Sequence, residues 1–297
     1  MTQPTFIVRH WRGQQPLPES WFWTGVILAV LSTPLVEGGV WVVERSSSLG
    51  LMALEWLAVL IFLAGIRVWA IVGLWRSACR HVERRGSAKW AEAAKAFLCV
   101  LVVAYLVRVP EIAPGLIEYG SLAVGHDPLG EPAKMTYEAG GRLKLTGVIT
   151  AGSARKFRQM AEARSDLREI ELESSGGRTF EALRIAQYVR LKHLNSIVQK
   201  ECSSACTLIL IAGKIRSARP SADIGFHQPE FPGWSENMRR RATVVINAEY
   251  SAAGMGPDFL IQVASTPAAK LWRPSFEELV RDGVLNGMSG GGSASSN

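Results

Sequence analysis

Three long apolar stretches in the first third of the chain most restrict how it can fold. They run from Trp21 to Val43, from Leu51 to Trp75 and from Trp90 to Val109. A helix of about 20 apolar residues is long enough to cross the hydrocarbon core of a bilayer. We therefore predict three transmembrane helices within residues 21–109. Their lengths and flanking tryptophans disfavour the alternative that they are buried core helices of a soluble domain.

The composition agrees with an integral membrane protein. Hydrophobic residues fill 48% of the 297 positions, and the mean hydropathy of +0.12 is high for a soluble enzyme. A cleaved signal peptide does not fit the N-terminus, because the first apolar stretch is too long and a second follows it at once. The lipid bilayer is therefore the first predicted partner.

The basic residues beside these stretches predict the orientation. Arg9 and Arg12 precede the first helix, and Arg45 follows it. The loop between the second and third helices is the richest in positive charge, with Arg76, Arg80, Arg84, Arg85 and Lys89. Cytoplasmic loops carry an excess of Lys and Arg, so residues 1–20 and this loop are predicted to be cytoplasmic. Three spans then place the C-terminal domain outside the cytoplasm.

The positive charge does not predict nucleic-acid binding. The formal net charge is +7, but the basic residues flank the apolar stretches and form no stripe interleaved with aromatic residues. Membrane topology explains them better than DNA or RNA.

Three ionisable residues lie within the apolar stretches, namely Glu37, Glu55 and Arg67. Such residues are costly in lipid and often functional, so one interpretation is an intramembrane relay. The simpler interpretation is that Glu55 lies near a helix end, Glu37 precedes a Gly-Gly break, and Arg67 pairs with a glutamate or extends to the interface. We favour the simpler one.

Residues 110–141 are rich in Pro and Gly and are predicted to be a linker with little regular structure. From Arg142 onward, alternating strand patterns are separated by helical patterns, which predicts parallel βα units. We place a globular α/β domain at residues 142–287 and a disordered Gly-Ser-rich tail at residues 288–297.

The most informative motif of this domain is the stretch Glu201–Thr207. The alternating residues before it predict a strand, and the apolar run after it, which ends at Gly213, predicts a buried helix. Ser204 therefore lies at a helix N-terminus. The free N–H groups and the dipole there stabilise negative charge, as an attacking oxygen and its oxyanion product require.

Two further motifs accompany Ser204. Gly176 and Gly177 lie between a predicted strand at Arg168–Glu173 and a predicted helix from Thr179. Paired glycines at such a turn let backbone N–H groups approach a ligand closely. A further strand delivers His227 before Gln228-Pro229. A lone histidine or serine more often has a structural role, but the combination predicts a hydrolase site.

These motifs resemble those of the Clp protease proteolytic subunit, the signal peptide peptidases and the wider ClpP/crotonase superfamily. Glu173-Ser-Ser-Gly-Gly177 is similar to the Ser-Pro-Gly-Gly turn of the family, with serine at the proline position. His227, in a strand that ends His-Gln-Pro, is similar to the family histidine. The resemblance covers Leu143 to Gly287 and implies a spiral ClpP/crotonase-like α/β domain, which follows the three-helix membrane anchor predicted from the apolar stretches.

The resemblance also implies roles for individual residues. Ser204 would be the nucleophile and His227 the base, and the turn at Gly176 and Gly177 would form the oxyanion hole with the N–H of Ala205. It implies a serine hydrolase acting on a peptide or protein, without a cofactor. Relatives assemble into rings or stacks, so a homo-oligomer is also implied.

The chain departs from the family at the third catalytic residue, which is usually an aspartate. The corresponding run, Pro267–Arg273, contains no carboxylate. Asp258, Glu230 and Asp282 are the alternatives from elsewhere in the sequence. A Ser-His dyad and an inactive site therefore both stay open, and the second interpretation of the chain is a non-catalytic interaction module.

Cys202 and Cys206 flank the predicted nucleophile on the side that we assign as oxidising. A spacing of four residues at a strand-helix corner can bring their Cβ atoms within bonding range, so we predict a disulfide. A thioredoxin-like role would need Cys-x-x-Cys. With His227 they would supply three metal ligands but no fourth, and no metal site is predicted.

Overall fold

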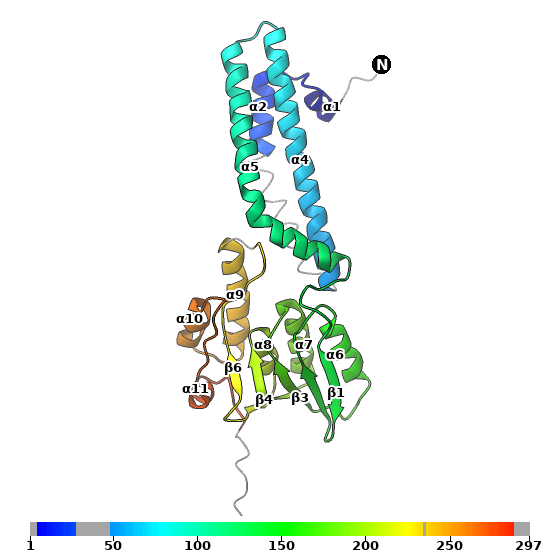
Figure 1. The fold of residues 1–297 in the computed structure, drawn as a ribbon, viewed down its shortest axis with the longest axis vertical. Helices are drawn as coiled ribbons and strands as arrows, with labels where there is room; N and C mark the ends of the chain where they lie inside the picture. The colour runs from blue at the N-terminus through cyan, green and yellow to red at the C-terminus, as the bar shows by residue number, and fades with distance from the viewer. Residues whose placement is uncertain (1–4, 28–47, 234–235, 288–297) are drawn as a thin grey trace, which may run out of the picture. The chain divides into compact units, whose positions relative to one another are not determined.

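The computed structural model describes residues 5–27, 48–233 and 236–287. It divides into two compact units, Met1–Ala123 and Val124–Asn297. The N-terminal unit is helical, and the C-terminal unit contains the sheet (Figure 1).

Two long helices dominate the N-terminal unit, α4 (Leu49–Glu83) and α5 (Ala88–Ala123). Both are long and apolar enough to cross a membrane. Only 22% of the most apolar window of α4 and 6% of that of α5 are buried, whereas a core helix of a soluble protein would be mostly buried. Small buried residues in one apolar cluster, Ala78 of α4 with Ala91 and Ala94 of α5, allow close packing of the two helices.

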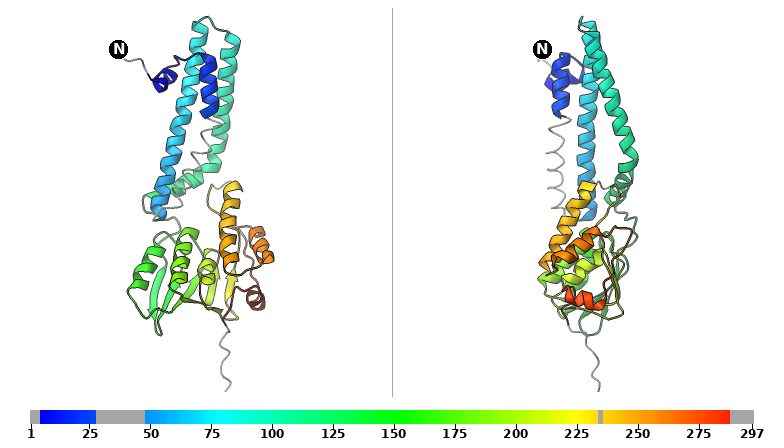
Figure 2. Two further views of the ribbon diagram at one scale, coloured as in Figure 1. Left: turned by 180° about the vertical axis from the view of Figure 1, so that it is seen from behind. Right: turned by 90° about the vertical axis from the view of Figure 1, so that its left-hand side faces the viewer.

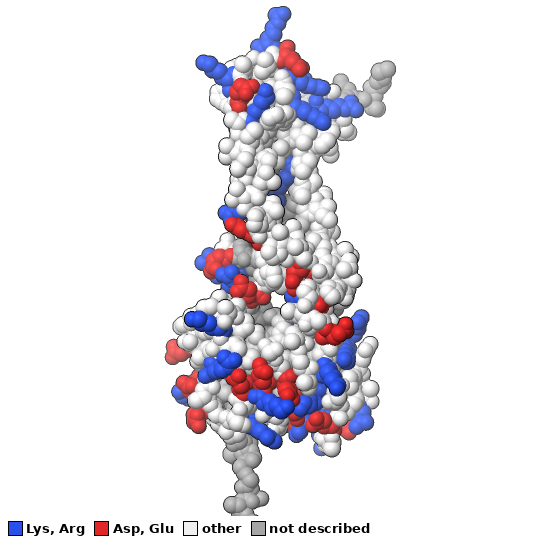
Figure 3. All heavy atoms as spheres, in the orientation of Figure 1, with Lys and Arg blue, Asp and Glu red and all other residues white. Residues whose placement is uncertain are grey.

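The shorter helices α1 (Phe6–Trp11) and α2 (Leu17–Val26) pack against α4. Arg76 donates to the Trp11 carbonyl at 2.8 Å, and Ser77 donates to the Gln15 carbonyl at 2.9 Å. The N-terminal segment therefore lies at the C-terminal end of α4, where the predicted basic loop begins. Figure 3 shows mostly basic side chains gathered at this end of the helices, beside a long surface with few charges.

Two of the three predicted spans are thus present as helices. The first, Trp21 to Val43, begins in α2 and lies mainly outside the described residues, as does Glu37. The Arg67 guanidinium lies 5.8 Å from the centre of the Tyr105 ring, a cation–π contact between α4 and α5. This contact was in neither interpretation of Arg67, and both stay predictions.

The predicted linker at residues 110–141 is wrong for most of its length. Helix α5 continues through Pro110 and Pro114 to Ala123, and strand β1 (Lys134–Glu138) follows. Proline removes one hydrogen bond but its fixed φ suits a helix, so a long helix accommodates it with a bend. Figure 1 shows α5 changing direction in its C-terminal part. Within the predicted linker, irregular structure is thus confined to residues 124–133 and to the turn at residues 139–141.

The C-terminal unit is built on one mixed sheet. Its strands are β1, β2 (Arg142–Thr146), β3 (Glu169–Ser174), β4 (Asn195–Ser203), β5 (Arg216–Ala218) and β6 (Asp223–Gly225). The strand order is β1-β2-β3-β4-β5, and β6 also pairs with β4. The expected parallel arrangement holds for β2 to β6, but β1 is antiparallel to β2. Neither β1 nor β5 was predicted from the sequence.

Helices cover one face of this sheet. They are α6 (Ser153–Glu162), α7 (Thr179–Leu191) and α8 (Ala205–Ile211), with α9 (Glu236–Ala252), α10 (Pro257–Ser265) and α11 (Phe276–Arg281) near the β6 end (Figures 1 and 2). The alternating apolar residues of the strands point to this face, so that Leu143, Leu145, Ile170 and Leu172 are fully buried.

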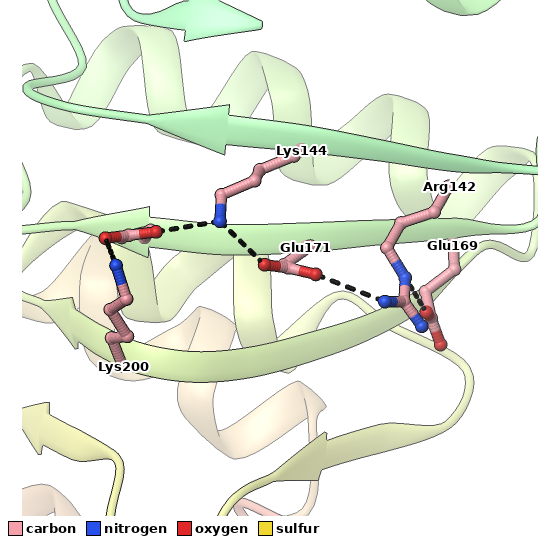
Figure 4. Close-up of polar contacts among 6 residues, drawn as sticks. Arg142, Lys144, Glu169, Glu171 and Lys200 are labelled. Carbon is pink, nitrogen blue, oxygen red and sulfur yellow. Dashed lines mark hydrogen bonds and ion pairs between the residues drawn. The ribbon is translucent and has the colours of Figure 1, made fainter. Parts of the chain in front are cut away.

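The opposite face carries a charged ladder (Figure 4). Lys144 lies 3.0 Å from Glu171 and 2.9 Å from Glu173. Hydrogen bonds from Lys200 and Lys144 hold the pKa of Glu173 below its usual value, and the same carboxylates raise the pKa of Lys144. The members of the ladder are Arg142, Lys144, Glu169, Glu171, Glu173 and Lys200.

Candidate active site

Ser204 lies at the corner between β4 and α8, as the sequence predicts. Its backbone has φ 54° and ψ −127°, a conformation that residues other than glycine rarely adopt. The side chain is half-buried, and no hydrogen bond from it caps the helix. In α/β-hydrolases, a strained serine between a strand and a helix is an exposed nucleophile.

Hydrogen bonds on both sides hold Ser204 in this conformation. Its N–H donates to the Gly225 carbonyl at 2.8 Å. Its carbonyl accepts from the N–H and the hydroxyl of Thr207, at 3.0 and 2.6 Å. The Thr207 hydroxyl also lies 2.6 Å from the hydroxyl of Tyr250, whose pKa is raised by burial. Thr207 and Tyr250 were not predicted as part of the site, because this support depends on the packing of α9 against α8.

Ser203, the neighbour of Ser204, is oriented differently. It is fully buried, and its hydroxyl has no hydrogen-bond partner. A Cβ atom built on Gly225 would lie 3.0 Å from the Ser203 Oγ, so this side chain faces the neighbouring strand β6. Of the two serines, only Ser204 is reachable from solvent.

Gly176 and Gly177 form the turn between β3 and α7, with φ values of 110° and 133°. A Cβ on Gly176 would lie 2.7 Å from the Ser204 Cβ, so this turn lies directly against the serine. The carbonyl of Gly176 accepts from the Ile149 N–H at 2.8 Å. Only glycine combines such φ values with so close an approach of the backbone.

The backbone N–H groups of Gly177 and Ala205 are the two that were predicted to form an oxyanion hole. Ala205 is the first residue of α8, so its N–H has no acceptor within the helix. Strands β3 and β4 are parallel neighbours, which brings the turn after β3 and the corner after β4 to the same edge of the sheet. The structure therefore brings Gly176, Gly177, Ser204 and Ala205 together.

His227 lies at the same edge, just beyond β6. Gly225 of β6 is the partner of Ser203 in the pairing with β4, and His227 follows Phe226. Its Nδ1 lies 2.7 Å from the Gln228 carbonyl. A carbonyl oxygen only accepts, so Nδ1 must donate, which leaves the lone pair on Nε2 when the ring is neutral. This is the tautomer that a general base needs.

No hydrogen bond or ion pair joins the His227 ring to any of the three alternative carboxylates in the described part of the chain. Glu230 pairs with Arg239 at 3.4 Å, and Asp282 pairs with Arg281 at 2.9 Å. Asp258 lies in the first turn of α10. Within the described residues, the Gln228 carbonyl is the hydrogen-bond partner of the histidine ring.

A disulfide joins Cys202 and Cys206, with their Cα atoms 5.3 Å apart. Both residues are fully buried, and the bond links the end of β4 to the first turn of α8. Because it encloses Ser204, it restrains the corner on both sides. Among the residues that the structure describes, no group of three or more His, Cys, Asp and Glu side chains is arranged to hold a metal ion.

A buried ion pair beside the glycine turn was not predicted. Asp127 and Arg178 are each 7% exposed, and the Arg178 Nη2 lies 2.6 Å from the Asp127 Oδ1. The one feature of the sequence that placed Arg178 near the site was its position directly after the glycine pair. Asp127 gave none, because it falls in the predicted linker.

No protein-family model matches the chain, and no curated protein matches it. Among solved structures, it is similar to ClpP1 from Listeria monocytogenes, with 18% sequence identity and a TM-score of 0.43. The match covers 49% of this chain and 89% of that chain. The C-terminal unit itself is an α/β domain built on one mixed sheet.

Proposed function

We propose that the chain is a membrane-anchored serine hydrolase whose substrate is a peptide or protein. The observation that carries the proposal is the backbone of Ser204. Its φ of 54° is maintained by hydrogen bonds on both sides, at a helix N-terminus and directly against Gly176. Strain of this kind costs on the order of 1–3 kcal/mol and concentrates at functional sites.

The reaction would follow the serine hydrolase scheme. The Ser204 Oγ attacks the substrate carbonyl carbon while the His227 Nε2 takes the hydroxyl proton. The N–H groups of Gly177 and Ala205 stabilise the negative oxygen that forms. His227 then gives its proton to the leaving group, and water hydrolyses the acyl-enzyme by the same steps.

The partner of His227 sets an expectation for the rate. The Gln228 carbonyl orients the ring and fixes its tautomer, as an aspartate does in a triad. A carbonyl is neutral, however, and stabilises the imidazolium ion less than a carboxylate does. We therefore expect slower turnover than in an enzyme with a complete triad.

We propose that the hydrolase domain lies outside the cytoplasm. We also propose that it forms a homo-oligomer, as the proteins that its sequence motifs resemble do. The basic residues at one end of α4 and α5 support a cytoplasmic location for that end. A disulfide beside Ser204 supports an oxidising compartment for the domain.

The second candidate is a membrane-anchored interaction module without catalysis. It is favoured by the absence of a carboxylate on His227 among the described residues. The two candidates differ in the reactivity of Ser204, since a binding module does not need an activated hydroxyl.

Fluorophosphonate labelling of the full-length protein tests the proposal, because these probes react with activated serines. Ser204→Ala should abolish labelling, and His227→Ala should reduce it by about 100-fold or more, because an unassisted hydroxyl is a weak nucleophile. Ser203→Ala is the matched control and should retain most of it. Equal labelling of the wild type and Ser204→Ala would overturn the proposal, and an unreactive wild type would favour the interaction module.

A further inference from the structure

The buried pair of Asp127 and Arg178 holds the glycine turn through its side chains. The Nε and Nη2 of Arg178 donate to the two oxygens of Asp127 at 3.1 and 2.6 Å. Arg178 directly follows Gly177. A bidentate bond of this kind fixes the direction of the guanidinium as well as its distance.

The Asp127 carboxylate also holds the segment that faces the glycine turn. It accepts from the Ala151 N–H at 2.7 Å and from the Leu129 N–H at 2.9 Å. Ala151 lies close in sequence to Ile149, which bridges the turn by accepting from the Arg178 N–H at 2.6 Å and pairing with Gly177. One carboxylate therefore restrains both backbones of this bridge.

The guanidinium also reaches the segment that follows His227. Its central carbon lies 5.6 Å from the centre of the Phe231 ring. Arg178 thus contacts chain on the histidine side of the site while its own backbone continues the glycine turn. A buried ion pair adds little stability compared with an apolar pair of the same size. The position of Asp127 and Arg178 beside the glycine turn therefore says more about their role than their contribution to stability does.

We propose that Asp127 and Arg178 are positioning residues that hold the Gly176-Gly177 turn, and with it the Gly177 N–H, in the orientation that the oxyanion requires. This inference rests on the proposed hydrolase function for its catalytic consequence. The consequence is expected in the reaction step, because the oxyanion exists only after the nucleophile has attacked.

Hydrogen exchange of the full-length protein in detergent micelles tests the positioning without any need for activity. Asp127→Asn keeps the shape of the side chain but removes the charge that Arg178 and two backbone N–H groups bind. We expect exchange of the Ile149 amide, which bonds to Gly176, to rise by roughly tenfold or more. Exchange in α10 should stay unchanged.

Fluorophosphonate labelling of the same variants measures the catalytic consequence. The maximal labelling rate should fall on the order of 10- to 100-fold, with little change in the probe concentration at half-saturation. Arg178→Lys keeps the charge without the bidentate geometry, so its maximal labelling rate should lie between those of the wild type and Asp127→Asn.

The matched control is Glu169→Gln, which breaks an arginine–carboxylate pair of 2.6 Å with Arg142. Glu169 begins β3, roughly 16 Å along the strand from its end at Ser174, and its variant should leave both measurements unchanged.

Wild-type exchange at Ile149 in both Asp127→Asn and Arg178→Lys would overturn the positioning role. The role would also be overturned if Glu169→Gln changed Ile149 exchange and the labelling rate as much as Asp127→Asn does. If the wild type does not label, the proposed hydrolase function fails, and the exchange result alone decides whether the pair positions the turn. Should Asp127→Asn fail to fold, Arg178→Lys decides by the same measurements.

Discussion

Replacing Gly176 with alanine is the sharpest test of how the site is built. The new methyl group would lie 2.7 Å from the Ser204 Cβ and 2.8 Å from the Ser203 carbonyl oxygen. Carbon atoms in contact are comfortable at about 3.5–4.0 Å, so the turn and the serine must separate by about 1 Å. The variant therefore displaces the predicted nucleophile from the predicted oxyanion hole without removing any catalytic group.

The expected effects have two separate causes. The φ of 110° at Gly176 is unfavourable for alanine by about 1–3 kcal/mol, and this lowers the free energy of unfolding. The displacement acts on the reaction, where a misplacement of about 1 Å costs on the order of 100-fold in rate.

Gly147→Ala separates the two causes. Gly147 has a similar φ of 95°, but a Cβ there would meet nothing within 4 Å. Gly147→Ala should lower only the free energy of unfolding, because of its positive φ. It should label with fluorophosphonate at nearly the wild-type rate. Protease resistance across a urea series would measure the stability of both variants. The reasoning is refuted if Gly176→Ala labels as fast as Gly147→Ala.

Three further predictions follow from other parts of the chain. Buried Arg216 donates to the Ile211, Ala253 and Gly283 carbonyls at 3.2, 3.1 and 2.7 Å, so Arg216→Met should lower the free energy of unfolding by about 3 kcal/mol, at about 1 kcal/mol per bond. Arg273→Met, which breaks a half-exposed pair with Asp223, should cost under about 1 kcal/mol in the same urea series; equal losses would contradict the role of Arg216. Burial opposes ionisation of Asp127, but the bonds from Arg178, Ala151 and Leu129 outweigh it and hold its pKa below the ordinary value. Its stabilising effect should therefore be complete above about pH 4 and decline as the pH falls further, and Asp127→Asn should show a smaller loss of stability in that acidic range than the wild type. Alkaline phosphatase fused after Ala133 should be active and a cytoplasm-dependent fluorescent protein at the same place dark; bright fluorescence without phosphatase activity would reverse the proposed orientation.

Local patterns in the sequence were enough to predict much of the architecture. The lengths of the apolar runs predicted the long helices α4 and α5, since crossing a membrane requires a minimum length. Alternating strands, helical spacing and glycine stops predicted β2, β3, β4 and the helices between them. The corner at Ser204 was predicted for the same reason, because a strand, a small residue and an apolar helix follow one another directly in the chain.

Only the tertiary structure decided which distant residues meet. Asp127 and Arg178 bond across a sequence separation of 51 residues, and Thr207 and Tyr250 across 43. No local pattern encodes such a contact, because it depends on how separate elements pack. Strand β1 was missed for the same reason, since its place in the sheet comes from pairing with β2.

The conformation of the candidate site was also decided only by the tertiary structure. The sequence places a serine before a helix and two glycines after a strand, but it does not say that their backbones touch. That contact arises because parallel β3 and β4 end at one edge of the sheet. The carbonyl partner of His227 and the left-handed φ of Ser204 are likewise consequences of packing, since each requires hydrogen bonds whose partners only the folded chain brings into place.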